Sequence, residues 1–300
     1  MANKNISLSV FFDHILQAQE QTGKSLSEIL AHISQIGVKA VEINLSYLLQ
    51  HPETLDLLQA SDLKISCIYE THYFVKNADE KSNSTRTVPS VADNFSDDFD
   101  DDFSDDFAKA RLHVDTACKV AAKKILVIPG FLSEKEAQNF SDCKDYQKVA
   151  KLMDESPAIQ NAKSQMKNLC DYAVQKNVEV TFEDYDFWTS PCSHANQLLW
   201  WFKNIPGLKL TFDTGNFLYS KEDVFQAYDL LKPYIAHVHC KDREGDFRCP
   251  PVGQGIFADF IAKLIKDLTA QNYPGYFAIE HFDAPDQWKF IEKSVDFLTR

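Results

Sequence analysis

Four stretches of the chain share one pattern, an alternating apolar run that closes on a side chain able to bind a metal ion. The stretches read VEVTFED, LKLTFDTGN, IAHVHCKD and YFAIEHF, and they place Glu183, Asp213, His239 and Glu280 near their ends. Three carboxylates held close together repel one another and protonate unless a positive charge offsets them. Three oxygen donors and one imidazole suit Mn²⁺ or Mg²⁺ and also accept Co²⁺ or Zn²⁺. The pattern therefore predicts one divalent metal ion held by these four residues.

The alternation also predicts the elements that position these ligands. In a β-strand, successive side chains point to opposite faces. Leu208, Leu210 and Phe212 share one face, so Asp213 closes the other. The same rule puts the other three ligands on the inner face of their strands, at the carboxyl end. The four ligands are each about one strand–helix unit apart, which predicts that they meet at one rim of a sheet.

Strand-like runs and amphipathic helical patterns alternate along the whole chain, which indicates parallel strands joined by crossover helices. Eight such units in 300 residues predict a closed (β/α)8 TIM barrel as a single domain over residues 1–300. No GxGxxG turn follows the first strand, which argues against an open doubly wound sheet. The predicted strands are 6–12, 39–46, 63–71, 124–130, 177–184, 208–215, 235–241 and 275–282, and the helical patterns include 24–36, 144–176, 194–204, 221–233 and 256–271.

Composition restricts the class of protein. Residues of hydrophobic type make up 44%, enough for a large core, and the net charge is −13, which argues against a broad surface for nucleic acid. The seven cysteines form no CxxC pair, so neither a disulfide framework nor a zinc knuckle is expected. The N-terminal stretch lacks the features of a signal peptide or a membrane span. We therefore expect a cytoplasmic protein with no nucleic-acid or membrane partner.

An acidic insertion, residues 76–107, follows the third predicted strand. Its first half is rich in Ser, Thr and Asn and predicts a loop. In its second half, within 92–107, Phe95, Phe99, Phe103 and Phe107 recur every four residues among aspartates, which predicts an amphipathic helix. The alternative is a lid or subunit contact that presents the phenylalanines over the barrel mouth. A calcium loop is not expected, since the DxDxDG pattern is missing.

The stretches FEDYD, FDTGN, HVHCKD, VGQG and AIEHF, in this order, resemble the xylose isomerase-like barrel superfamily, and within it the sugar phosphate isomerase/epimerase group. In that family a Glu, Asp, His, Glu set holds one divalent metal, which implies Glu183, Asp213, His239 and Glu280 here. Lys241 and Asp242 match the Lys-Asp pair that typically follows the ligand histidine. The chain departs from the family where Asn216 replaces the His of a DxGH form and where Asp184-Tyr185 replaces Asn-His after the strand-five Glu.

The resemblance implies an enzyme that moves a proton next to the carbonyl of a sugar or sugar phosphate through a metal-stabilised enediolate. Glu183 and Glu280 are then the catalytic carboxylates. Two carboxylates on opposite faces of the substrate give an epimerase, one shuttling carboxylate gives an aldose–ketose isomerase, and loss of β-hydroxide gives a dehydratase of the inosose type. Candidate contacts to this small sugar substrate are His72, Asn216, His237, Lys241, Asp242 and Arg243.

Several interpretations remain beside this one. The backbone N–H groups of PVGQGIF could receive an anionic group of the substrate, and Phe187, Trp188 and Trp200 could form an apolar wall. Rival functions are a metal-dependent phosphodiesterase like endonuclease IV, a two-carboxylate glycoside hydrolase, and a barrel that binds a sugar without turnover. Members of the family often form dimers or tetramers, so the expected assembly is a homodimer or homotetramer.

Overall fold

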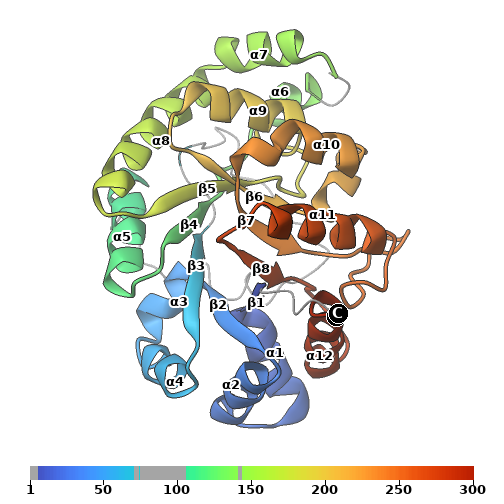
Figure 1. Ribbon diagram of the computed structural model, residues 1–300. Coiled ribbons are helices and arrows are strands. Elements are labelled where there is room, and N and C mark those ends of the chain that lie inside the picture. Colours follow the sequence, from blue (N-terminus) through green and yellow to red (C-terminus); the bar gives the residue numbers. More distant parts are fainter. Residues whose placement is uncertain (1–5, 71–73, 75–105, 141–143) are drawn as a thin grey trace.

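The computed structural model describes residues 6–70, 74, 106–140 and 144–300. Eight parallel strands close into a barrel in the order β1-β2-β3-β4-β5-β6-β7-β8, with β8 paired to β1. Figure 1 shows the strands at the centre and the helices around them. The predicted (β/α)8 barrel is therefore confirmed. The strands are β1 (Ser7–Phe11), β2 (Val38–Asn44), β3 (Lys64–Glu70), β4 (Lys124–Val127), β5 (Glu179–Glu183), β6 (Lys209–Asp213), β7 (Ile235–Cys240) and β8 (Tyr276–Ile279).

The helices cover the outer face of the barrel. In chain order, and with two 3₁₀ turns, they are α1 (Phe12–Thr22), α2 (Leu26–Gln35), α3 (Leu45–Gln50), α4 (Thr54–Ala60), α5 (Asp106–Lys119), α6 (Glu134–Gln138), α7 (Tyr146–Glu155), α8 (Pro157–Gln175), α9 (Ala195–Asn204), η2 (Asn216–Leu218), α10 (Val224–Leu231), η3 (Lys232–Tyr234), α11 (Ala258–Ala270) and α12 (Gln287–Leu298). The predicted insertion lies outside the described residues from 75 to 105, and with it the predicted helix through Phe95, Phe99 and Phe103.

The helix predicted over 144–176 is two helices, α7 and α8, that meet at Ser156. Pro157 is the first residue of α8, and a proline there disfavours helical backbone in the residue before it. Ser156 accordingly adopts an extended conformation with ψ of 116°, and its hydroxyl accepts a hydrogen bond from the Ile159 N–H. The Ser-Pro pair thus ends one helix and caps the next, a local signal that the prediction overlooked.

The apolar faces of the strands pack outward against the helices, as the alternation predicted. Phe212 of β6 is fully buried, and its ring centroid lies 5.8 Å from that of Tyr228 on α10 and 6.0 Å from that of Phe260 on α11. Leu208 and Leu210 belong to the same core. Burial of these side chains between sheet and helices provides the main hydrophobic stabilisation, and it turns the opposite strand face toward the barrel axis.

Several side chains on that inner face are polar and fully buried. The hydroxyl groups of Ser9 and Ser66 lie 2.6 Å apart across the barrel, and Thr211 Oγ1 donates to Thr181 Oγ1 at 2.8 Å. Buried polar groups need such partners, because an unpaired one would be destabilising. Among the described residues, no helix is long and apolar enough to cross a membrane.

Candidate metal centre

The four predicted ligands come together at the carboxyl end of the barrel. Glu183 ends β5, Asp213 ends β6, His239 lies on β7, and Glu280 directly follows β8. One ligand atom from each lies within 4.8 Å of the others, and all four residues are buried. His239 Nδ1 lies 3.0 Å from Glu183 Oε1, 3.1 Å from Glu280 Oε2 and 4.0 Å from Asp213 Oδ2. Nδ1 of His239 thus faces all three carboxylates.

The turn after β6 aims the Asp213 carboxylate. Its Oδ1 accepts hydrogen bonds from the backbone N–H groups of Gly215 at 2.7 Å and Asn216 at 2.8 Å. The Asp213 N–H in turn donates to Asp184 Oδ1 at 2.8 Å. Because Oδ1 is held by the turn, Oδ2 faces the cluster. Asp213 therefore shapes the turn and also supplies a ligand atom.

The donor set fits a divalent cation. Burial, together with repulsion from Glu280 and Glu183, raises the pKa of Asp213 to about 8, even though the Lys241 ammonium opposes the rise. Asp213 Oδ2 and Glu280 Oε2 are buried and receive no well-aligned hydrogen bond from any described residue. The Lys241 ammonium is an ion-pair partner of both carboxylates and lies 3.2 Å from Asp213 Oδ2. One lysine does not neutralise three buried carboxylates, so the cluster can accommodate a cation of higher charge.

Glu42 of β2 lies directly beneath the cluster and was not among the predicted residues. Its carboxylate contacts His237 Nε2 at 2.8 Å and His239 Nε2 at 3.2 Å, and all three side chains are buried. Burial alone would raise its pKa, but the two imidazoles lower it to about 2. Because the Glu42 carboxylate contacts Nε2 of His239, the other ring nitrogen, Nδ1, faces the three carboxylates of the cluster. The alternation in β2, where Glu42 stands between Val41 and Ile43, gives the signal that could have found it.

Three of the predicted substrate contacts form a row along the rim. The Asn216 side-chain amide donates to Glu183 Oε1 at 3.2 Å, while Asn216 Oδ1 accepts from Lys241 Nζ at 2.9 Å and from Arg243 Nη2 at 3.3 Å. These contacts connect a ligand carboxylate to two cationic side chains. Asn216 thus keeps a polar contact to the cluster. Their role in substrate binding stays a prediction.

Two of the other three, His237 and Asp242, lie away from this row. His237 is one inward step below His239, is fully buried and contacts Glu42, so it does not reach the barrel mouth. His72 is outside the described residues. Asp242 is buried, and its two carboxylate oxygens accept hydrogen bonds from four backbone N–H groups, those of Arg243, Gly253, Gly255 and Phe257. The anion that the PVGQGIF loop receives is therefore the chain's own carboxylate, which folds the loop and is not available to a substrate.

A further pair at the mouth, Asp13 and Tyr69, also escaped the sequence analysis. The Tyr69 hydroxyl donates to Asp13 Oδ2, and burial raises the pKa of both groups. Phe11 lies between this pair and the cluster, with its ring centroid 4.9 Å from that of His239. Of the predicted apolar wall, Phe187 and Trp188 are 38% and 44% exposed, whereas Trp200 is only 1% exposed and belongs to the core.

Comparisons with known proteins show the family and the fold of the chain. The model of the xylose isomerase-like TIM barrel family matches residues 30–300. A probable 3-DHS dehydratase involved in petrobactin synthesis in Bacillus anthracis is 16% identical, with a TM-score of 0.66 over 98% of this chain and 99% of that one. A 3-keto-D-glucoside 4-epimerase from E. coli is 15% identical, with a TM-score of 0.62 over 98% of each chain.

A xylose isomerase-like TIM barrel protein from Mycobacterium smegmatis, solved in complex with magnesium, is 15% identical, with a TM-score of 0.63 over 100% of this chain and 99% of that one. A search of curated protein sequences found no significant match. At such identities, the solved structures show the shared fold. The family model spans most of the chain, and the chain belongs to the xylose isomerase-like TIM barrel family.

Proposed function

We propose that this protein is a divalent-metal-dependent isomerase or epimerase of a small sugar or sugar phosphate, acting by proton transfer next to a carbonyl through an enediolate. The observation that carries the proposal is the buried cluster in which Glu183 and Glu280 both approach Nδ1 of His239, with Asp213 beside them. Structural neighbours that are named as epimerases support the reaction class. Glu183, Asp213, His239 and Glu280 would hold the ion, with Mn²⁺ or Mg²⁺ favoured by the oxygen donors.

When bound, the cation would supply Lewis acidity toward the substrate carbonyl. The chain supplies the proton transfers. Glu183 and Glu280 come from strands β5 and β8, so each can face the substrate from its own side of the mouth. One carboxylate accepts the proton from the carbon next to the carbonyl, and the other returns a proton on the opposite face, which inverts that centre. Return by the same carboxylate to the neighbouring carbon gives an isomerase.

The remaining polar side chains at the rim would orient the sugar. The Asn216 amide already donates to Glu183, and the Lys241 ammonium lies beside Glu280 and Asp213. Lys241 could also protonate a departing hydroxyl group, so dehydration is the second candidate reaction. The neighbour named as a probable dehydratase gives this alternative its support.

Proton exchange tests the proposal. The Mn²⁺-loaded protein is incubated in D₂O with ketoses, inososes and their phosphates, and carbon-bound hydrogen is followed by NMR. We expect deuterium next to the carbonyl, abolished by EDTA and by Glu280→Gln. Loss of water, seen as a new ultraviolet absorbance of a conjugated ketone, would identify the dehydratase. Exchange that survives EDTA would contradict the metal-dependent mechanism.

A further inference from the structure

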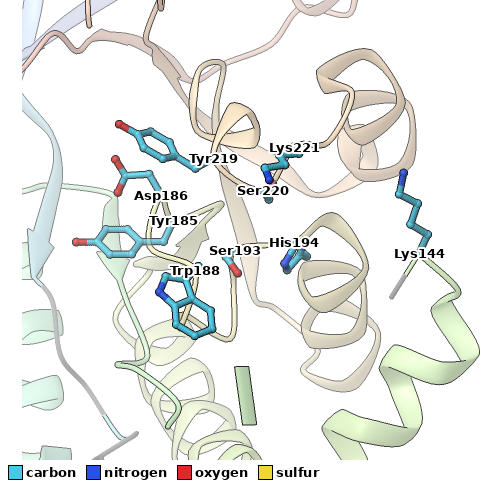
Figure 2. Close-up of a pocket in the computed structure, with 9 residues that line it drawn as sticks. All are labelled: Lys144, Tyr185, Asp186, Trp188, Ser193, His194, Tyr219, Ser220 and Lys221. Atoms are coloured by element: carbon cyan, nitrogen blue, oxygen red, sulfur yellow. The ribbon is translucent and has the colours of Figure 1, made fainter. Parts of the chain in front are cut away.

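A pocket of about 450 Å³ lies beside the barrel mouth, outside the metal cluster. Two loops provide most of its lining, the segment 185–194 after β5 and the segment 219–221 after β6. In Figure 2, Tyr185, Trp188 and Tyr219 lie at one end of the pocket, and Lys144 lies at the other. The volume is within the range of small-molecule sites, roughly 300–1,000 Å³.

Two buried side chains, Arg243 and Asn216, stand between the pocket and the metal cluster. The Arg243 guanidinium lies over the Tyr219 ring at 4.9 Å, and its Nη2 lies 3.4 Å from Asp186 Oδ2, so two lining residues contact it directly. The same nitrogen contacts Asn216 Oδ1, and Asn216 donates to Glu183. Only two side chains therefore separate a ligand carboxylate from the lining of the pocket. A molecule that occupies both the cluster and the pocket therefore has to span Arg243 and Asn216.

The lining combines aromatic faces with hydrogen-bonding groups. The Trp188 ring is 44% exposed, although burial of so large a ring would be favourable. The Tyr219 ring is 41% exposed and already contacts the Phe247 ring, with centroids 4.8 Å apart, and the Arg243 guanidinium at 4.9 Å. The rest of the lining includes the Asp186 carboxylate, the His194 imidazole and the Lys221 ammonium. A pyranose ring presents C–H groups on its faces and hydroxyl groups at its edge. Aromatic faces and polar groups in one lining match both properties.

We propose that this pocket is a subsite for a second sugar ring, so that the substrate is a glycoside or disaccharide whose carbonyl-bearing ring reaches the metal cluster. The inference rests on the proposed function, because a sugar at the cluster is what places a linked ring here. A single monosaccharide at the cluster would leave the pocket unfilled. The aromatic end next to Arg243 receives the ring, and the ammonium groups farther out contact its hydroxyls.

Binding tests the subsite without turnover. Maltose, cellobiose and glucose are titrated into the Mn²⁺-loaded protein, and binding is followed by saturation-transfer NMR and tryptophan fluorescence. We expect at least one disaccharide to bind about fivefold more tightly than glucose, and Trp188→Ala to remove about that factor, as one aromatic contact is worth roughly 1 kcal/mol. Phe225→Ala is the matched control, since Phe225 is 46% exposed and does not line the pocket. It should leave binding unchanged.

The outcomes separate this inference from the proposed function. If deuterium exchange occurs with monosaccharides, while disaccharides gain no affinity and Trp188→Ala has no effect on KM, the subsite is refuted and the proposed function stands. If disaccharides bind through Trp188 but no sugar exchanges deuterium, the subsite stands and the proposed reaction fails. Binding of phosphorylated sugars alone, lost in Lys144→Ala and Lys221→Ala, would overturn the assignment to a neutral ring.

Discussion

Glu42→Gln tests whether the carboxylate beneath the cluster positions the ligand histidine. The substitution keeps the shape of the side chain but replaces one acceptor oxygen with an NH₂ donor. In the native protein, Nε2 of both His237 and His239 contacts the Glu42 carboxylate. With an amide, only one of the two imidazoles finds an acceptor. When His239 is the one left facing NH₂, its proton moves to Nδ1, which then has no lone pair for a metal ion.

The magnitude follows from the contact that is lost. A hydrogen bond to a charged acceptor contributes roughly 1.5–3 kcal/mol, and outer partners of metal ligands typically change metal affinity by about 10–100-fold. We therefore expect Glu42→Gln to weaken Mn²⁺ binding by about 10–100-fold, measured by isothermal titration calorimetry. Urea denaturation of the same preparations reports whether the variant is folded.

Two further variants sharpen the test. Glu70→Gln is the matched control. Glu70 is a buried glutamate at the end of β3 that accepts a hydrogen bond from the Ser46 hydroxyl at 2.7 Å. It belongs neither to the four-ligand cluster nor to the group of Glu42, His237 and His239. The variant should keep native Mn²⁺ affinity. Adding His237→Phe to Glu42→Gln removes the competing donor and frees the amide oxygen for His239, so most of the affinity should return. Native affinity in Glu42→Gln, or no recovery in the double variant of a folded protein, would refute the positioning role.

Two other predictions concern stability. Asp242→Asn should lower the unfolding free energy, measured by urea denaturation, by about 2–6 kcal/mol. The reason is that two of the four backbone N–H groups that donate to Asp242 lose their acceptor, at a cost of roughly 1–3 kcal/mol each. A change below about 1 kcal/mol would contradict this prediction. Burial lowers the pKa of His113 from 6.5 to about 4, so between these values the unfolded chain binds more protons and stability falls as pH falls. The unfolding free energy should fall by about 2 kcal/mol between pH 7 and pH 5 because of this residue. His113→Gln should flatten the dependence of the unfolding free energy on pH, and an unchanged dependence would refute the role given to His113.

The sequence was sufficient for features that depend on local pattern. Alternation within each strand predicted that Asp213 and Glu280 end on the inner face, and the closed barrel then brings those ends to one rim. Even the missed break between α7 and α8 has a local signal in Ser156-Pro157. The alternation in β2 also marks Glu42 as an inward residue, but its contact with His237 has a different origin. Glu42 and His237 are 195 positions apart in the chain and meet only across the barrel interior, and no spacing rule reports such a contact.

Asp242 shows why a family motif alone does not assign a role. Lys241 and Asp242 are adjacent in the chain, and both are buried next to the rim, yet their side chains diverge. The Lys241 ammonium joins Asp213 and Glu280, whereas the Asp242 carboxylate takes up backbone N–H groups of its own loop. Neighbours in an extended chain point in opposite directions, so one member of the pair serves the site and the other builds the loop that carries Arg243.

The charges at the rim bear on the role of Lys241 in the candidate metal centre. The three ligand carboxylates and the Lys241 ammonium leave an excess of two negative charges, which a divalent cation neutralises and a monovalent cation does not. Without the lysine, the excess would be three, and a bound divalent ion would still leave a buried carboxylate uncompensated. Lys241 thus reduces the excess negative charge of the three ligand carboxylates, and its ammonium remains beside the carboxylates that would transfer protons.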